Sequence, residues 1–335
     1  MVISSKLIKY SLMKKTLLLL LLFANTLIVN AQQDAQFSQY MFNGLYINPA
    51  YAGYKEQANI HTFYRSQWTG FEGAPQTMSL AGDMVLNEGN VGLGILLSND
   101  FTGAQSNFSA YANYAYRIQV GDSEFSRLSF GLGAGIVQQG IDGDLLTAND
   151  VDQYVPFGKP TESFPDARAG IFYSTPRFFA GLSADNLIAS YFQARNSSQN
   201  VLLPKINRHY YFTAGALFTL NDDVKLKPTI LLKDDEQTYT SLDINAFTLL
   251  YDRFWVGGFY RTAVKTYKKE FLYDDLQKKN GLGVIGDFFI NENLRIGYAF
   301  DYSLSKLRNY NYGSHEISIG FMLSSKRREG PKCYF

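Results

Sequence analysis

The chain has very little cysteine, histidine and tryptophan: its 335 residues include one Cys, three His and two Trp. Cys333 has no partner for a disulfide within the chain. The three histidines lie far apart, and with no second Cys they do not predict a zinc site. Neither an H-E-x-x-H nor a G-x-S-x-G motif occurs. The sequence therefore predicts no metal, no cofactor and no enzyme activity.

The first 31 residues are the only place where an apolar run follows a cluster of lysines. Four lysines precede the apolar stretch 17–23, and the segment ends on the small residue Ala31. This order is typical of a secretory signal peptide. We expect cleavage after Ala31, with Met13 as an alternative start. The apolar stretch is too short for a membrane anchor, which needs about twenty residues.

Beyond the leader, long apolar runs and clustered positive charge are both scarce. No stretch reaches the roughly eighteen apolar residues that a spanning helix needs. The chain carries a net charge of +1, and removal of the four leader lysines leaves −3. The only basic cluster is 326–328. Nucleic acid is therefore excluded as an expected partner.

What is present is a strict alternation that recurs along the mature chain. In 294–304 the residues at even positions are apolar or aromatic, and those at odd positions are small or polar. Tyr and Phe number 24 and 26, which fits aromatic girdles at two membrane interfaces. A soluble sheet would need a second layer over its apolar face, and no helical pattern supplies one. We predict an all-β fold, an antiparallel transmembrane β-barrel of about fourteen strands that faces lipid outward.

Fourteen strand candidates cover most of the chain. They are 56–68, 75–87, 90–101, 105–119, 124–139, 166–175, 177–187, 209–220, 223–233, 236–250, 253–263, 279–290, 293–304 and 314–324. Short connections follow even-numbered candidates, and the three longest, 140–165, 188–208 and 264–278, follow odd-numbered ones. Outer-membrane barrels place short turns in the periplasm. We therefore expect a barrel over 56–324, a periplasmic tail over 325–335, and both termini in the periplasm.

The faces opposite the apolar ones are rich in glycine, as at Gly92, Gly94, Gly131 and Gly133. Interior glycines permit another backbone to approach closely. We expect a lumen that is at least partly filled, by a loop or by the N-terminal segment 32–55. The aromatic residues of that segment suit a short helix before Pro49, and we expect it at the periplasmic mouth.

Two patterns resemble ligand sites but are poorly supported. Residues 281–286 match G-x-G-x-x-G, but a strand and a turn follow where a dinucleotide site needs a helix. The connection 140–165 holds four aspartates at 142, 144, 150 and 152. Their spacing does not match the twelve-residue calcium loop, so a solvated acidic loop is the favoured interpretation.

Three stretches are more specific than a barrel requires. One runs Asn48-Pro49-Ala50-Tyr51-Ala52-Gly53, the second runs Gln67-Trp68-Thr69-Gly70-Phe71-Glu72-Gly73-Ala74-Pro75, and the third is a tail with Arg327-Arg328. Together with Gln36–Asn43, Phe164–Asp166 and Gly313–Glu316, and in this order, they resemble the PorP/SprF family of type IX secretion outer-membrane proteins in Bacteroidetes. The resemblance covers essentially the whole mature chain.

The resemblance implies a non-enzymatic component of the secretion and gliding-motility machinery. The implied partners are outer-membrane lipid, the periplasmic ring or peptidoglycan-associated components, and a large secreted adhesin with a C-terminal sorting domain. The family offers no catalytic residues to carry over. The candidate structural or partner-contact residues are Asn48, Pro49, Tyr51, Gly53, Gln67, Trp68, Gly70, Phe71, Gly73, Pro75, Arg327 and Arg328.

Two other function classes stay open at this point. A passive pore or small-molecule transporter would use the same barrel with an open lumen. An outer-membrane hydrolase would assemble Ser and His from separate strands. The turn Gly70–Pro75 has two interpretations, a fixed loop folded into or over the lumen or a turn that simply joins two strands. Trp68 also suits a membrane interface.

Overall fold

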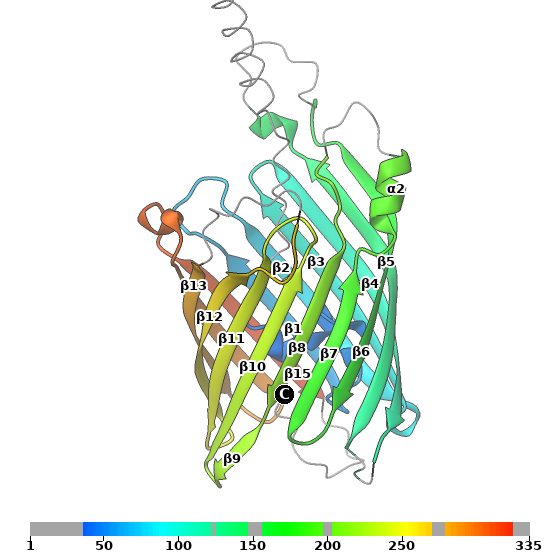
Figure 1. Ribbon diagram of the computed structural model, residues 1–335, viewed down its shortest axis with the longest axis vertical. Coiled ribbons are helices and arrows are strands. Elements are labelled where there is room, and N and C mark those ends of the chain that lie inside the picture. The colour runs from blue at the N-terminus through cyan, green and yellow to red at the C-terminus, as the bar shows by residue number, and fades with distance from the viewer. Residues whose placement is uncertain are drawn as a thin grey trace, which may run out of the picture. The chain divides into compact units, whose positions relative to one another are not determined.

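The computed structural model describes residues 36–121, 123, 125–146, 156–196, 203–269 and 279–323. Within these residues, fifteen strands form one antiparallel sheet that closes into a barrel, because β10 pairs with both β8 and β11 (Figure 1). The strands are β1 Ala58–Ser66, β2 Gln76–Leu86, β3 Val91–Thr102, β4 Gln105–Gln119, β5 Arg127–Ile141, β6 Thr161–Ser174, β7 Phe178–Asp185, β8 His209–Ala216, β9 Phe218–Asn221, β10 Val224–Asp234, β11 Thr240–Leu250, β12 Phe254–Val264, β13 Lys279–Phe289, β14 Leu294–Ser303 and β15 Ser314–Leu323.

The predicted fold class is confirmed: the ring is a fourteen-stranded antiparallel barrel with one extra short strand. The short strand β9 is the extra one: β8 pairs with Thr229–Asp234 of β10, and β9 continues along the same edge of β10 at its other end. The predicted strand 209–220 is therefore present but broken at Leu217, whose side chain is buried. β1 and β15 pair with Ala58 opposite Leu323, so the first and last strands are neighbours.

The apolar face of the alternating strands is exposed and the polar or small face is buried, as the sequence predicts. In β14 the exposed side chains include Ile296, Tyr298 and Tyr302, whereas Arg295 and Asp301 are buried. In β5 the exposed face is apolar, and Gly131 and Gly133 lie on the buried face. The barrel thus carries an apolar outer surface around an interior with many charged side chains.

The connections divide the barrel into two ends. We call the end with the connections 142–160, 186–208 and 265–278 the long-connection end, and the opposite end the short-turn end. The helix α2, Ala189–Asn196, lies at the long-connection end (Figure 1). The carboxylate of Asp166 accepts from the backbone nitrogens of Ile188 and Ala189, at 3.2 and 2.9 Å, and so fixes the start of this helix. Among the described residues, no helix is both long and apolar enough to cross a membrane.

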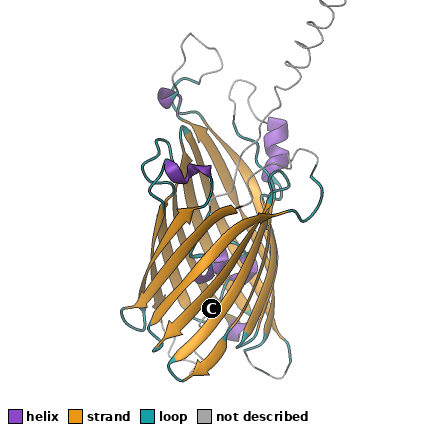
Figure 2. Cartoon of the chain, turned by 60° about the vertical axis from the view of Figure 1, so that its left-hand side comes forward, coloured by secondary structure: helices purple, strands orange, loops and turns teal. Residues whose placement is uncertain are grey.

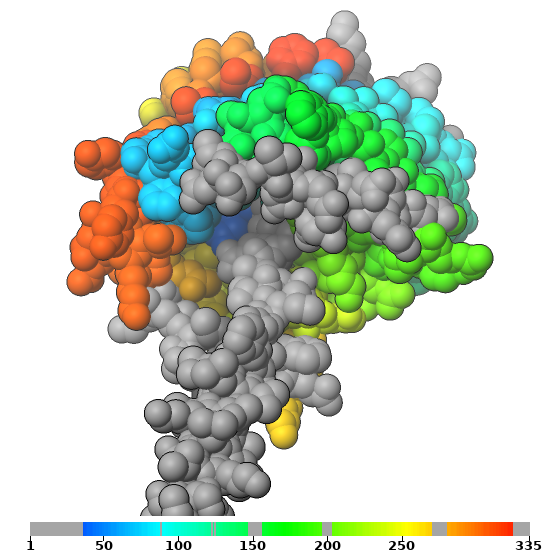
Figure 3. Space-filling view, turned by 90° about the horizontal axis from the view of Figure 1, so that it is seen from above, coloured from blue at the N-terminus to red at the C-terminus, as the bar shows by residue number. Residues whose placement is uncertain are grey.

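Residues 36–57, which we call the lumen segment, lie inside the ring of strands (Figures 2 and 3). They form three short 3-10 turns, η1 Tyr40–Phe42, η2 Gly44–Tyr46 and η3 Pro49–Tyr51. Almost every residue from 37 to 54 is buried. Three further 3-10 turns lie in connections: η4 Asn87–Gly89, η5 Gly143–Leu145 and η6 Lys306–Asn309.

The structure differs here from the expectation of a short helix at the mouth of the barrel. The segment is buried on all sides, so it has no solvent face, and its aromatic residues point in several directions rather than along one stripe. Asn43 and Asn48 lie in extended or irregular backbone and interrupt the turns. A continuous helix is therefore replaced by three separate turns.

Candidate functional site

The candidate site is the interface between the lumen segment and the inward face of the barrel. Inward glycines let the two backbones meet. A Cβ added at these positions would overlap the lumen segment: Gly92 at Ala52, Gly94 at Leu45, Gly131 at Ala50, Gly170 at Asn48 and Gly297 at Gln39. The predicted close approach of another backbone is thus present at Gly92 and Gly131. Gly133 and Gly283 instead make room for the side chains of Arg168 and Phe259.

Near the long-connection end, a buried charge network holds the start of the lumen segment. Arg65 donates to Asp301 at 2.5 Å, to Glu316 at 3.2 Å and to the Ser38 hydroxyl at 3.0 Å. Glu316 is fully buried, and its two carboxylate oxygens accept from the backbone nitrogens of Ser38 and Gln39, both at 2.9 Å. The carboxylate that neutralises Arg65 therefore also anchors the segment's backbone.

A second arginine extends this network across the lumen. Arg261 of β12 pairs with Asp243 of β11 through its Nε and Nη2 atoms, at 2.9 to 3.0 Å. It also donates to the side chain of Gln36 at 3.0 Å and to the backbone oxygen of Phe37 at 3.3 Å. Its Nη1 lies 3.6 Å from Asp301, so the two arginine clusters share one carboxylate.

A third arginine holds the middle of the segment. Arg168 of β6 forms a two-point contact with Asp185, at 2.9 and 2.8 Å. Its other donors reach the backbone oxygens of Leu45 and Tyr46, at 3.3 and 2.7 Å. Both carbonyls belong to η2, so the guanidinium ties this turn to β6 by hydrogen bonds to its backbone.

The Asn-Pro-Ala-Tyr-Ala-Gly stretch predicted as a candidate motif lies within this interface. Asn48 accepts from the nitrogen of Ala50 at 2.9 Å and donates to the backbone oxygens of Ile171 and Leu182 on β6 and β7. Pro49 occupies the first turn position of η3, where its lack of an N–H costs nothing. Tyr51 packs edge-on against Phe172, with ring centroids 5.6 Å apart.

Gly53 ends that motif at the short-turn end. Its φ is +74°, a conformation that favours glycine, and its nitrogen donates to Asp83 at 2.9 Å. Arg117 donates to its backbone oxygen at 2.7 Å and pairs with Glu56 at 3.4 Å. The chain then turns directly into β1. The lumen segment thus runs from the long-connection half of the barrel to the short-turn end.

The expectation that both ends of the chain lie in the periplasm falls on residues outside those that the structure describes. The first described residue, Gln36, contacts Arg261 in the long-connection half, whereas Leu323, the last described residue, lies at the short-turn end beside Ala58. Residues 1–35 and 324–335, including Arg327 and Arg328, lie outside the described residues.

The second candidate motif forms the connection between β1 and β2 at the long-connection end. The Gln67 nitrogen donates to the Pro75 oxygen at 2.9 Å, which closes the loop. Hydrogen bonds also tie the loop to the neighbouring connections: Thr69 to Gly313, and Gly103 to Gly73. Gln67 is buried, Trp68 is half-buried, and Phe71 is 49% exposed at the tip. The loop is fixed by these contacts, and its tip faces outward.

Two glycines of this loop have positive φ angles, +90° at Gly70 and +71° at Gly73. Trp68 also has a positive φ, and its nitrogen donates to the Ser314 hydroxyl at 3.1 Å. A Cβ at Gly70 would overlap the ring of Tyr312, so the small residue lets the two loops touch. The motif thus joins the loop 67–75 to the connection 304–313.

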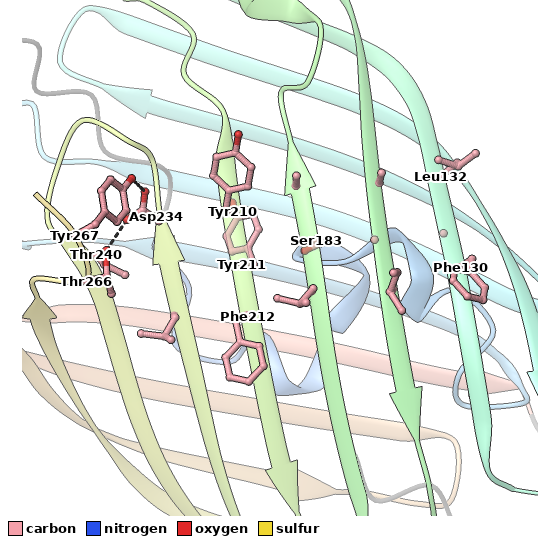
Figure 4. Close-up of a pocket in the computed structure, with 17 residues that line it drawn as sticks. Phe130, Leu132, Ser183, Tyr210, Tyr211, Phe212, Asp234, Thr240, Thr266 and Tyr267 are labelled. Atoms are coloured by element: carbon pink, nitrogen blue, oxygen red, sulfur yellow. Dashed lines mark hydrogen bonds between the residues drawn. The ribbon is translucent and has the colours of Figure 1, made fainter. Parts of the chain in front are cut away.

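The outer face of the barrel bears an open hollow of about 750 Å³ over β5 to β8 and β10. Figure 4 shows apolar side chains of this hollow on β5, among them Phe130 and Leu132, and Phe212 on β8. A polar rim near the long-connection end contains Tyr267, whose hydroxyl donates to Asp234 at 2.9 Å. In the part of the chain that the structure describes, no group of three or more His, Cys, Asp or Glu is placed to hold a metal ion.

The closed sheet, its apolar outer surface and its charged, filled interior define an outer-membrane β-barrel protein. The family model described as "Type IX secretion system membrane protein PorP/SprF" matches residues 29–321. The chain therefore belongs to the PorP/SprF family, and it is an outer-membrane component of the type IX secretion system. No curated protein matches it.

Solved structures with similar folds are distant in sequence. The monoaromatic hydrocarbon channel CymD is 10% identical, covers 84% of this chain and 92% of its own, and has a TM-score of 0.48. The outer membrane protein Omp33 of Acinetobacter baumannii is 5% identical, covers 81% of this chain and 100% of its own, and has a TM-score of 0.46. Likenesses this remote say nothing about what this chain binds or moves.

The arginine network was not among the residues singled out from the sequence. Each of these arginines sits at an inward position of a strand, directly after an apolar or aromatic residue: Tyr64, Ala167 or Tyr260. That pattern alone signals a charged residue inside the lumen. Arg65 and Asp301 are 236 positions apart, however, so only the strand order shows that they meet.

Proposed function

We propose that this protein is a non-enzymatic docking component of the type IX secretion and gliding machinery. It supports secretion or surface attachment of a large adhesin that bears a C-terminal sorting domain, and it contacts periplasmic ring or peptidoglycan-associated components. The observation that carries this proposal is the filled lumen. A barrel whose interior is occupied by its own chain is better suited to holding partners at its two ends than to passing solutes.

The same observation weighs against a passive pore. Residues 37–54 pack against inward side chains from several parts of the ring, including Phe63 of β1, Phe172 of β6 and Trp255 of β12. The segment is held by at least three buried arginines rather than by contacts at one edge. Opening the lumen would require breaking these contacts. Each hydrogen bond to a charged group contributes about 1.5–3 kcal/mol to stability.

For the adhesin, the favoured contact surface is the pair of joined loops at the long-connection end. Phe71, Tyr310 and Tyr312 are 49%, 70% and 82% exposed. Exposed aromatic side chains on a fixed loop are typical of protein interfaces, because they offer large contact area at low entropy cost. The proposal places this end outside the cell and the short-turn end, where β15 ends, in the periplasm.

The adhesin contact is tested by substitution in cells. A deletion strain is complemented with wild type, with Phe71→Ala/Tyr312→Ala, or with the control Tyr191→Ala, which removes an exposed tyrosine from α2 at the same end. We expect the double variant to reach the outer membrane at wild-type level but to lose adhesin from the cell surface. Normal surface adhesin in the deletion strain itself would reject the proposed function.

The periplasmic contact is tested separately through the tail 325–335, which includes Arg327 and Arg328. Deletion of this tail is expected to abolish co-purification of ring or peptidoglycan-associated components while the barrel still inserts. If partner capture and adhesin export both survive the deletion, the tail is not the contact. Conductance in planar bilayers adds a third readout, because an open pore would conduct and the docking role predicts little current.

A further inference from the structure

The open hollow on the outer face of the barrel, which we call the outer hollow, follows the register of the sheet. Two rows of outward residues cross β5, β6, β7, β8 and β10, and each residue pairs with the next along its row. The first row, from Phe130 to Leu232, holds only large apolar or aromatic side chains. The second row lies nearer the long-connection end and consists of Leu132, Ala169, Ala184, Tyr210 and Asp234. Both rows line the outer hollow (Figure 4).

The second row has a notch in its middle. Ala169 and Ala184 have its shortest side chains, and they lie between Leu132 and Tyr210, which are both exposed. Ser183 donates to the backbone of the lumen segment from the inward face, so Ala184 beside it faces outward. The backbones of the two wall residues are three strand spacings apart, which is about 14 Å. The side chains of the walls take up part of that width, so the notch between them is narrow.

The outer hollow rises from within the membrane toward its surface. Leu132 lies well inside β5, whereas Asp234 is the last residue of β10 and Thr240 is the first of β11. The strands of such a barrel are tilted, so a row that crosses them climbs along the barrel axis. From β5 to β10 the row crosses four strand spacings, which is about 19 Å. One leaflet of the hydrocarbon core is about 15 Å thick, so the outer hollow is long enough for one lipid tail.

The end of the outer hollow nearest the long connections is a hydrogen-bonded polar rim. Asp234 accepts from the Tyr267 hydroxyl at 2.9 Å, from Lys269 Nζ at 2.8 Å and from the Thr240 hydroxyl. The hydroxyls of Thr240 and Thr266 lie 2.7 Å apart. A tyrosine at this height is typical of a membrane–water interface. The outer hollow is therefore apolar along its length and polar at one end, which is the order of the acyl chain and headgroup of a lipid.

We propose that the outer hollow binds one acyl chain of lipid A, the membrane anchor of lipopolysaccharide, with the headgroup at Tyr267 and Lys269. A hydrocarbon chain carries no side chains and fits the notch, whereas a partner helix is about 10–12 Å across and is too wide for it. Lipid A occupies the outer leaflet, and the proposed orientation of the barrel puts the polar rim there. The choice of leaflet rests on that orientation, whereas the outer hollow and its polarity do not.

The test titrates lipid A against the purified full chain in detergent and measures thermal unfolding. We expect lipid A to raise the unfolding midpoint of the wild type to a plateau. Ala184→Phe fills the notch with an apolar ring, and it is expected to raise the half-saturating lipid A concentration at least tenfold. Ala169→Leu fills the notch from the neighbouring strand and is expected to give the same loss if Ala184→Phe does not fold. The matched control is Ala246→Phe, at an exposed alanine of β11 outside the outer hollow, and it keeps the wild-type response.

Two further arms identify the occupant. Phosphatidylethanolamine, a phospholipid of the inner leaflet, is titrated in parallel and is expected to give no plateau. Native mass spectrometry of protein purified from outer membranes counts bound lipid A and protein copies. We expect one lipid A on the wild type and on Ala246→Phe, and none on Ala184→Phe.

Three results would overturn the proposal. The first is an equal lipid A response in the wild type and in both notch variants. The second is a plateau with phosphatidylethanolamine instead of lipid A. The third is a wild-type dimer that Ala184→Phe dissociates, which would assign the outer hollow to a second copy of the chain. None of these results bears on the adhesin contact, which is tested separately at Phe71 and Tyr312.

Discussion

The substitution Gly131→Leu tests whether the lumen segment is packed backbone to backbone against the barrel. A Cβ at Gly131 would overlap the backbone of Pro49 and Ala50 rather than a flexible side chain, so the clash has no local escape. Forcing extra atoms into a packed site costs about 1–3 kcal/mol. The barrel must either accept this strain or release the nearby part of the lumen segment.

The contacts of the lumen segment around Asn48 decide between these outcomes. Release would break two hydrogen bonds from Asn48 and one from Ser183 to the backbone of Ile47, each worth about 1 kcal/mol. It would also expose the buried ring of Tyr51, and exposing a large apolar side chain costs about 1.5–3 kcal/mol. Release therefore costs about 5 kcal/mol. Because strain is cheaper, we expect the segment to stay in the lumen.

The assay combines stability with conductance. We expect Gly131→Leu to lower the free energy of unfolding by about 1–3 kcal/mol in urea titrations of the barrel in detergent micelles, with wild-type conductance in planar bilayers. Ala134→Leu is the matched control, because Ala134 faces outward on the same strand. Equal stability of the two variants would refute the packed interface. A new conductance in Gly131→Leu would refute the energy ordering.

Three further predictions test other parts of the structure. Arg65→Met leaves two buried carboxylates without their shared cation and is expected to cost about 3–5 kcal/mol of unfolding free energy, with partial rescue by Arg65→Lys; a neutral result would contradict the buried network. Ile296→Arg or Phe130→Arg places a charge on the lipid face and is expected to cost about 2–4 kcal/mol in bilayer refolding, whereas tolerance of both would contradict the assigned faces. Gly53→Ala puts a side chain at a φ of +74° beside another backbone and is expected to cost about 1–3 kcal/mol, more than Gly121→Ala, which has a φ of +81° and open space around it. Urea titration of the last pair checks the difference, and equal losses would mean that the backbone angle alone matters.

The strands could be predicted closely because one rule governs them all. Hydrocarbon outside the barrel demands apolar side chains at every second position, and the alternation in 294–304 marks both the bounds of β14 and the direction of its faces. The same rule located 105–119 as a strand with its observed bounds. β6 begins at Thr161, five residues before the predicted start, because the strand continues past the alternating stretch by pairing with β5.

The lumen segment obeys no such rule, which is why its form was mispredicted. Its residues face partners on every side, so no period of 2 or 3.6 describes them. The inward glycines indicated that another backbone comes close, but they did not say which one. The buried charge network was missed for a similar reason: Arg65, Asp301 and Glu316 lie on three different strands and become neighbours only when the first and last strands pair.

Local patterns in the sequence are enough to predict the strands, their turns and the face that meets the membrane. Each of these features depends on residues within about fifteen positions of one another. It also depends on the membrane lipid, which surrounds every strand in the same way. What occupies the interior follows from the arrangement of the strands around the ring. Closure of the ring brings Ser38 to Asp301 and Gln36 to Arg261, and such pairings follow from strand order and register, which no local pattern encodes.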